Sequence, residues 1–258
     1  MFKKIALAAA LVSSAAFATW DYYPVLEAGK GSAKGNLYYD WDHDWSQAGL
    51  GIGARYTIIP GLEISLQDWG YQFWSEVDCS GCENGGDGLR DLTIGGRYQF
   101  DPMVNAFVDM HLPIGGDEVT NDEISLYLGS QFSMAINEAP GLKFGTEAGI
   151  LWGFEHDNFE RGLDIHLGGE IAYTVPNVGV TPFFGLQIKY RLTESEEERG
   201  GKEYGKDDDG NKQVNLWLGA DYFVIPNQLD IWAKLIVRSG KVDDGDATGL
   251  NVGAEFFF

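Results

Sequence analysis

Turn-forming breaks divide this chain at regular intervals, and short breaks alternate with long ones. The short breaks contain Pro, Asn and Gly, and they lie at 58–61, 101–103, 137–141, 175–179 and 225–228. The long breaks are acidic and rich in Gly, and they lie at 42–46, 75–88, 113–122, 155–162, 193–212 and 240–248. Short turns at one edge and long loops at the other are typical of an up-and-down antiparallel sheet.

The segments between these breaks have the length of single strands, and they number 12. We expect strands at 33–42, 46–57, 62–74, 88–100, 103–113, 123–136, 142–154, 163–175, 180–192, 213–224, 229–239 and 248–258. In the sixth of them, Leu126 and Leu128 fall on one face and Ser125 and Tyr127 on the other, which is the period of a β-strand.

The two faces of these segments differ in charge. One face is almost free of charge, whereas the other carries acids, bases and many glycines, which a dry core could hold only with strict pairing. The pattern therefore favours an apolar, lipid-facing exterior around a polar lumen. A soluble β-sandwich, the alternative all-β architecture, would place the apolar face inside.

The segment 62–74 changes parity in its middle. Apolar residues up to Leu66 share one face, whereas those from Trp69 onward share the other. Because a slip of one residue turns every later side chain to the opposite face, the sequence predicts a β-bulge near Gln67 and Asp68.

The amino terminus has the order of a secretory signal. Lys3 and Lys4 precede an apolar run, and small residues follow as far as Ala18. No later stretch reaches 18 consecutive apolar residues, and strands can cross hydrocarbon only as a closed barrel. We therefore predict a cleaved signal peptide at 1–18, a plug or periplasmic tail at 19–32 and a transmembrane β-barrel at 33–258.

The chain is strongly acidic, with a formal net charge of −21. Nucleic acid is therefore an unfavourable partner, because binding phosphates requires a basic face. Carboxylates gathered in the long loops attract cations over about one Debye length, roughly 8 Å at physiological salt. Asp207, Asp209, Asp243 and Asp246 are weak calcium-ligand candidates, but their spacing does not match a calcium-binding loop, so we predict solvated loops, no metal and no cofactor.

Two cysteines lie close together in one of the acidic breaks. Cys79 and Cys82 are separated by two residues, and a secreted chain passes through an oxidising compartment, so a small disulfide loop is expected. Free thiols and metal binding stay open as alternatives.

The signal sequence, the 12 alternating segments and the final strand ending at Phe258 resemble the outer-membrane β-barrels of Gram-negative bacteria. The resemblance implies an outer-membrane location, contact with outer-membrane lipid, and a role for Phe258 as the mark that the barrel-assembly machinery reads. Locally, "GLGIGARYTIIPGLEISL" (49–66) and "GLRDLTIGGRYQF" (88–100) resemble the strand-turn-strand phrases of transporter barrels grouped with a phenol-degradation channel. The resemblance of these two stretches does not indicate a substrate.

The strand parity also predicts which side chains line the lumen. The titratable ones are Arg55, Glu63, Asp91, Arg97, Asp109, His111, Glu123, Glu147, Asp164, His166, Glu170, Lys189, Arg191, Asp221, Asp230, Lys234, Arg238 and Glu255. Many glycines share this face and leave room, and 12 strands allow either a narrow pore or a filled lumen. The mixed charge with a modest acidic excess favours small hydrophilic solutes.

These observations predict a porin-like channel that passes small hydrophilic solutes with a mild preference for cations. One alternative is a transporter for hydrophobic molecules, which needs an apolar pocket built from Phe107, Phe183, Trp217 and Trp232. A second is a structural or adhesive barrel with a filled lumen. A lipid-modifying hydrolase is disfavoured, because no serine pattern that marks a nucleophile accompanies the four histidines, His43, His111, His156 and His166. We therefore predict no catalytic residues.

Overall fold

The computed structural model describes residues 24–77, 86–116, 119, 123–154, 159–198, 203–242 and 245–258. Twelve long strands form its body: β1 (Gly31–Trp41), β2 (Trp45–Ile59), β3 (Leu62–Val77), β5 (Leu92–Asp101), β6 (Val104–Leu112), β7 (Ile124–Ala135), β8 (Leu142–Phe154), β10 (Asp164–Tyr173), β11 (Val180–Arg191), β14 (Lys212–Ile225), β15 (Leu229–Gly240) and β16 (Ala247–Phe257). Four short strands accompany them: β4 (Gly88–Leu89), β9 (Phe159–Glu160), β12 (Glu196–Glu198) and β13 (Glu203–Gly205). Within the described ranges, no helix is long and apolar enough to cross a membrane.

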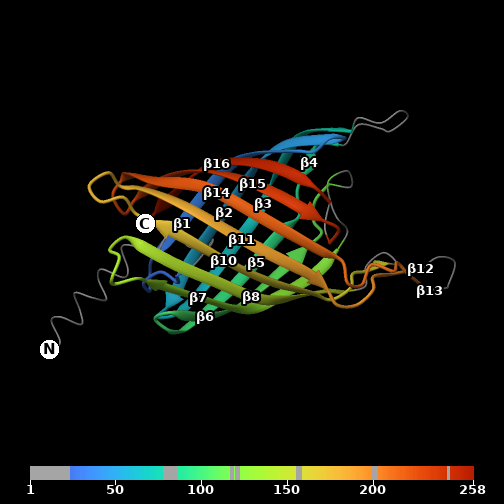
Figure 1. Ribbon diagram of the computed structural model, residues 1–258, viewed down its shortest axis with the longest axis horizontal. Coiled ribbons are helices and arrows are strands. Elements are labelled where there is room, and N and C mark those ends of the chain that lie inside the picture. The colour runs from blue at the N-terminus through green and yellow to red at the C-terminus, as the bar shows by residue number, and fades with distance from the viewer. Residues whose placement is uncertain are drawn as a thin grey trace.

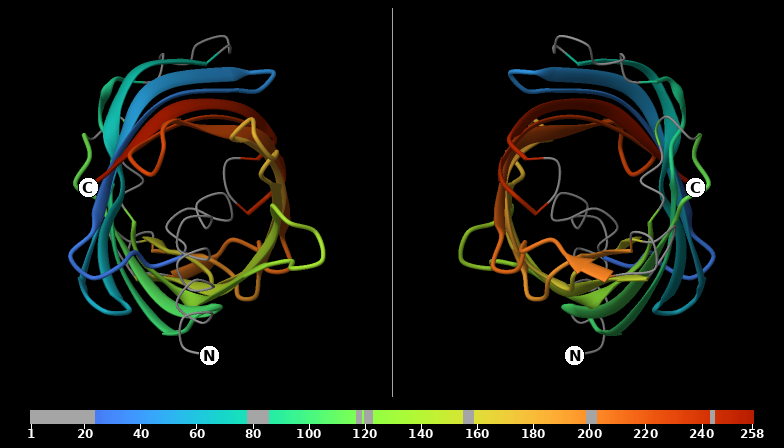
Figure 2. Two further views of the ribbon diagram at one scale, coloured as in Figure 1. Left: turned by 90° about the vertical axis from the view of Figure 1, so that its left-hand side faces the viewer. Right: turned by 90° about the vertical axis from the view of Figure 1, so that its right-hand side faces the viewer.

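The twelve long strands form one closed antiparallel barrel. Each long strand pairs with the next, and β1 closes the ring by pairing with β16, from Ser32 opposite Phe257 to Trp41 opposite Thr248. Figure 2 shows this ring end on. Closure removes the free edges of the sheet, as a hydrocarbon environment requires. The predicted 12-stranded up-and-down barrel is therefore confirmed.

The connections segregate to the two ends of the barrel, with the short turns and the carboxyl terminus on the left of Figure 1 and the long loops on the right. The first predicted long break is an exception. β2 begins at Trp45, and the Asp42 N–H donates to the Trp45 carbonyl oxygen at 2.8 Å, so this connection is a tight turn. The predicted break at 193–212 is also structured, because β12 and β13 lie in it, and β12 pairs with both β13 and β9 in a small separate sheet.

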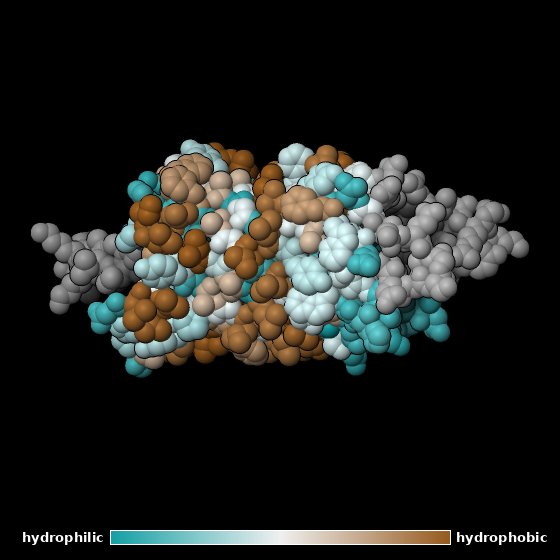
Figure 3. All heavy atoms as spheres, turned by 90° about the horizontal axis from the view of Figure 1, so that it is seen from above, coloured by the Kyte–Doolittle hydropathy of each residue, from teal (hydrophilic) through white to brown (hydrophobic). Residues whose placement is uncertain are grey.

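The outer face of the barrel is apolar and the inner face is polar. Leu37, Leu167 and Leu218 on the outside are 58%, 52% and 59% exposed, whereas Asn105 and Asp164 on the inside are 0% exposed. In Figure 3 hydrophobic residues cover much of the outer surface of the strands, and hydrophilic residues gather toward the ends. This arrangement is the reverse of a soluble domain and is the one that a bilayer stabilises.

The predicted bulge in β3 is present. Pairing with β5 shifts register between Leu66 and Asp68, so the residues before and after Gln67 face opposite sides. The bulge brings Asp68 to the lumen, where its carboxylate lies 3.2 Å from the Arg90 guanidinium. An acid that simple alternation would turn toward lipid is thereby paired inside.

Candidate functional site

Aromatic side chains on the inner face lie over glycines of neighbouring strands. The pairs are Tyr38 over Gly49, Tyr127 over Gly149, Phe183 over Gly219, Trp217 over Gly185 and Trp232 over Gly253. A Cβ atom added at Gly185 would lie only 2.2 Å from the Trp217 ring, so no other residue fits beneath that ring. The space left by these glycines is therefore occupied by rings held against the wall.

A cavity of about 380 Å³ lies inside the barrel, and charged side chains dominate its lining. Five of them are basic and four acidic: Lys34, Arg90, Arg97, Lys234 and Arg238, with Asp40, Asp68, Asp109 and Glu147. Asn36, Gln67, Thr93 and Asn251 and the rings of Tyr38, Tyr127 and Trp232 complete it. Convergent polar groups around an open space are what a hydrophilic solute requires. The slight basic excess here differs from the acidic excess expected for the whole lumen.

A bidentate ion pair holds one wall of this cavity. Arg97 Nη1 and Nη2 donate to the two carboxylate oxygens of Asp109, each at 3.3 Å, and Gln67 also donates to Asp109. The guanidinium carbon of Arg97 lies 5.7 Å from the centre of the Phe107 ring. Because both charges are buried, this pairing is required to offset their desolvation.

The wall next to this pair carries a carboxylate held by neutral donors. The Tyr127 hydroxyl donates to Glu147 Oε1 at 2.6 Å, and Gln131 Nε2 donates to Glu147 Oε2 at 2.7 Å. Asn105 in turn donates to Gln131 at 3.0 Å, which fixes the orientation of that amide. The side chains of β6, β7 and β8 thus form one rigid network.

At the short-turn end, the segment that precedes β1 lies against the inner wall. Arg55 Nη1 donates to the Pro24 carbonyl oxygen at 3.1 Å, and the Leu26 N–H donates to Glu63 Oε2 at 3.3 Å. Arg55 and Glu63 are 4% and 1% exposed, and their charged atoms are 3.8 Å apart. Residues 24–26 are therefore held against the inner wall at this opening, whereas the part of the predicted 19–32 segment before Pro24 lies outside the described residues.

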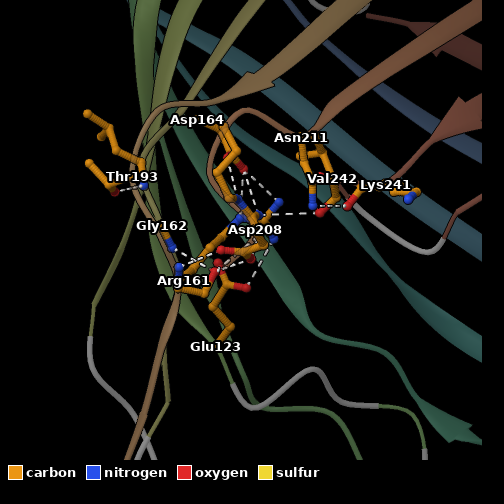
Figure 4. A network of polar contacts seen from close by, with 12 residues as sticks. Glu123, Arg161, Gly162, Asp164, Thr193, Asp208, Asn211, Lys241 and Val242 are labelled. Carbon is orange, nitrogen blue, oxygen red and sulfur yellow. Dashed lines mark hydrogen bonds and ion pairs between the residues drawn. The ribbon is translucent and has the colours of Figure 1, made fainter. Parts of the chain in front are cut away.

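At the long-loop end, a buried ionic network joins the loops to the rim (Figure 4). Arg191 donates from Nε to Asp164 Oδ1 at 2.8 Å and from Nη2 to Asp164 Oδ2 at 3.2 Å, and its Nη1 lies 2.5 Å from Asp208 Oδ2. Arg161 adds contacts of 2.8 Å to Asp164 and 3.3 Å to Glu123. The guanidinium groups of Arg161 and Arg191 thus bind the carboxylates of Glu123, Asp164 and Asp208, and these residues come from separate segments of the chain.

Ser195 and a main-chain oxygen extend this network. Asp208 accepts hydrogen bonds from the N–H and hydroxyl of Ser195 at 2.7 and 2.8 Å, and Arg191 Nη2 donates to the Val242 carbonyl oxygen at 3.3 Å. Partial burial raises the pKa of Asp208, but the Ser195 hydrogen bonds and the Arg191 charge outweigh it, so the pKa lies below its usual value. The network therefore favours the ionised carboxylate.

The structure places the predicted lumen residues at three levels of the inner wall. Arg55, Glu63, Asp221, Asp230 and Glu255 lie toward the short turns; Arg97, Asp109, Glu147, Glu170 and Lys234 lie along the middle of strands; Asp91, His111, Glu123, Asp164, His166, Lys189, Arg191 and Arg238 lie toward the long loops. Half of them form ion pairs with one another, such as Arg55 with Glu63 and Arg97 with Asp109. Their part in conduction stays a prediction.

The acidic loop residues that lie close together differ from the set of calcium-ligand candidates taken from the sequence. Carboxylates of Glu194, Asp207 and Asp209 gather within 4.8 Å of one another, all exposed. Asp246 instead accepts a hydrogen bond from the Gly240 N–H at 3.0 Å. Asp243, Cys79, Cys82, His156 and residues 1–18 lie outside the described residues, so the predicted disulfide and signal peptide stay predictions.

Each histidine in the described residues contacts a neighbouring side chain. His111 Nδ1 lies 3.2 Å from the Thr93 hydroxyl, and its Nε2 lies 3.3 Å from Asp91. The His166 ring packs 5.0 Å from the Tyr127 ring, and His43 is an exposed turn residue 3.3 Å from Asp44. These contacts orient imidazoles, and none of them pairs a histidine with a serine.

The carboxyl-terminal phenylalanines face different ways. Phe257 is 8% exposed and packs 6.0 Å from the Phe223 ring inside the barrel, whereas Phe256 and Phe258 are 49% and 56% exposed on the outside. The Phe258 main chain exchanges two hydrogen bonds with Gly31. The role of Phe258 in assembly stays a prediction.

Comparison with known families identifies the chain. The sequence model of the family described as "Putative MetA-pathway of phenol degradation" matches residues 23–246. The chain belongs to this family. The phenol-degradation family was also the one that the phrases at 49–66 and 88–100 resemble, so that resemblance is confirmed. A comparison with curated protein sequences found no significant match.

Solved structures share the fold of this family member. An outer-membrane channel from Pseudomonas putida F1 superimposes with a TM-score of 0.69 at 14% identity, covering 92% of this chain and 98% of the channel. The NanC porin gives 0.52 at 10%, covering 87% and 98%, and the β domain of a Bordetella autotransporter gives 0.55 at 15%, covering 89% and 99%. The shared fold is that of outer-membrane barrels, and with its apolar exterior the protein is an outer-membrane protein, as predicted.

Proposed function

We propose that this protein is a passive channel for small hydrophilic solutes, with a mild preference for cations. The observation that carries the proposal is the cavity of about 380 Å³ inside a closed barrel, lined by nine charged side chains. A wall of fixed, paired charges presents hydrogen-bonding groups to water and solutes without requiring the wall to rearrange. The similar fold of a channel and a porin supports this function.

The cation preference follows from the overall charge. The chain has a formal net charge of −21, and the long loops at one mouth carry exposed carboxylates, including Glu194, Asp207 and Asp209. Such a mouth concentrates cations locally, and the effect weakens as salt rises. The preference should therefore be larger at low ionic strength than at high.

Three of the four aromatic side chains that an apolar transporter pocket would use are held against glycines of the barrel wall. Phe183, Trp217 and Trp232 each cover a separate glycine, and Trp217 Nε1 donates to Glu170 at 2.6 Å. A largely apolar hollow of about 630 Å³ does exist, but exposed outer residues such as Ile64 and Val108 line it, so it faces lipid. These features favour a hydrophilic lumen. Catalysis is not part of the proposed function.

Planar-bilayer recording of the purified, folded protein tests the proposal. We expect discrete ion steps and, in a KCl gradient, a reversal potential of the sign that cation preference gives. Asp207→Asn combined with Asp209→Asn should reduce that potential without changing the size of the steps much. A folded protein that gives no ion steps would refute the channel and favour a structural or adhesive barrel.

A further inference from the structure

Most charged groups around the lumen cavity are neutralised by ion pairs. Three pairs have their closest charged atoms 3.2 to 3.5 Å apart: Arg90 with Asp68, Arg97 with Asp109 and Arg238 with Asp40. Lys34 lies opposite Glu255 on the neighbouring strand and also has contacts of its own. Two lining charges stand apart from this pairing, Lys234 on β15 and Glu147 on β8.

Lys234 contacts an aromatic ring and no acid within the described residues. Its Nζ lies 5.9 Å from the centre of the Trp232 ring, and across the neighbouring strands it faces Gly219 and Asn251, which carry no charge. Trp232 is itself held over Gly253. Lys234 also lines the cavity, and carboxylate oxygens are good acceptors for an ammonium group.

Glu147 is an acidic residue whose hydrogen-bond donors are neutral. It is 7% exposed, and its two hydrogen bonds come from the neutral Tyr127 hydroxyl and Gln131 amide. Arg97 lies near enough to act on it electrostatically, but the guanidinium is engaged with Asp109. A carboxylate offers about four lone-pair positions, so Glu147 retains acceptor capacity toward the cavity that it lines.

Lys234 and Glu147 line the same cavity from different parts of the barrel wall. Four strand steps separate β15 from β8 around the barrel, through β14, β11 and β10, and both side chains line the same cavity. Its volume of about 380 Å³ equals roughly a dozen water molecules at about 30 Å³ each. An amino acid or a very short peptide fits that space.

We propose that the cavity binds a zwitterionic solute, an amino acid or very short peptide, with its carboxylate on Lys234 and its ammonium on Glu147. The inference rests on the proposed channel function and names the solute class. A zwitterion compensates both lining charges at once, whereas an anion or a cation alone leaves one of them without a partner. Because a zwitterion has no net charge, the acidic loops at the mouth do not repel it.

Three probes of one skeleton test the proposal: L-phenylalanine carries both charges, 3-phenylpropionate only the carboxylate, and phenethylamine only the ammonium. Each is added at neutral pH during single-channel recording in KCl. Phenylalanine should interrupt the current at concentrations about fivefold below those that the two singly charged probes require, which is the upper end of the factor expected from one additional partly exposed charge contact. Equal potency of all three would overturn the proposal.

Substitutions assign the two charges. Lys234→Met should weaken the phenylalanine effect about fivefold and leave phenethylamine unchanged, whereas Glu147→Gln should weaken phenylalanine and leave 3-phenylpropionate unchanged. Lys189→Met, which removes an inward lysine that does not line the cavity, is the matched control and should behave as wild type. If Lys189→Met and Lys234→Met have the same effect, the position of Lys234 is not what matters and the site is refuted.

A second readout separates this inference from the channel proposal. Isothermal titration calorimetry of the folded protein in detergent measures phenylalanine binding without requiring conduction. Binding without ion steps would refute the channel and keep the site; ion steps without phenylalanine binding would keep the channel and refute the site. Heat-modifiable migration on a gel verifies that each variant is folded before it is compared.

Discussion

Replacing Arg191 by Met should destabilise the barrel and free the long loops from its rim. The guanidinium of Arg191 bridges Asp164, which is 0% exposed, to Asp208 and to the Val242 carbonyl oxygen. Methionine retains much of the side-chain volume but leaves these acceptors without their donor. The lost interaction is therefore electrostatic more than steric.

The size of the effect follows from burial. Removing one partner of a buried ion pair costs about 3–5 kcal/mol. Arg161 still lies 2.8 Å from Asp164 in the variant, so we expect the lower end, about 3 kcal/mol. Asp164→Asn alone should also destabilise, since it leaves Arg191 without the carboxylate that accepts two of its hydrogen bonds.

Urea unfolding in lipid vesicles, followed by tryptophan fluorescence, measures these differences. The double variant with Arg191→Met and Asp164→Asn should cost less than the sum of the single variants, by about 1–2 kcal/mol, because neither charge is then left alone. Strict additivity, or an Arg191→Met variant within about 0.5 kcal/mol of wild type, would refute the network as a stabilising unit.

Three further predictions follow from the rim, the wall and the last strand. Because the pKa of Asp208 is lowered on folding, its stabilising contribution is present above the ordinary value of about 3.9 and is lost as pH falls through the lowered value. The protection of residues 193–198 and 203–211 against hydrogen exchange, relative to an unfolded chain at the same pH, should therefore fall below about pH 4, and Asp208→Asn should remove that loss of protection. Gly185→Val should push the neighbouring tryptophan ring off the wall and reduce single-channel conductance, whereas Gly169→Val, where a Cβ meets its nearest atom at 3.4 Å, should leave conductance nearly unchanged. Phe258→Ser should reduce assembly into the outer membrane more than Phe257→Ser does; equal membrane yields would contradict an assembly role specific to the outward ring.

The parts of the fold that one strand encodes by itself were predictable. Alternation assigns each side chain to lipid or lumen, and the parity change after Leu66 located the bulge, because a bilayer penalises a charge on the wrong face. The break at 42–46 was overestimated, since polar composition does not distinguish a long loop from the tight turn closed by Asp42 and Trp45.

The features that depend on register between strands were not predictable from parity. The pairing of Trp217 with Gly185 requires knowing which residues lie opposite each other across a long loop. For Tyr38 and Gly49 the signal existed, because the turn at 42–44 sets that register. The contacts of Asp208 with Arg191 and Ser195 depend on loop conformation, for which the sequence has no period.

The tryptophan rings held over glycines can also serve as intrinsic fluorescence probes of the barrel. Trp217 and Trp232 belong to the lumen wall, whereas Trp152 is 49% exposed on the outer face. An aqueous quencher such as iodide should reach the first two only through the mouths, and brominated lipids should reach the third only from the bilayer. In a variant that retains only these three of the eight tryptophans, fluorescence lifetimes can therefore report the hydration of the lumen and the depth of insertion separately.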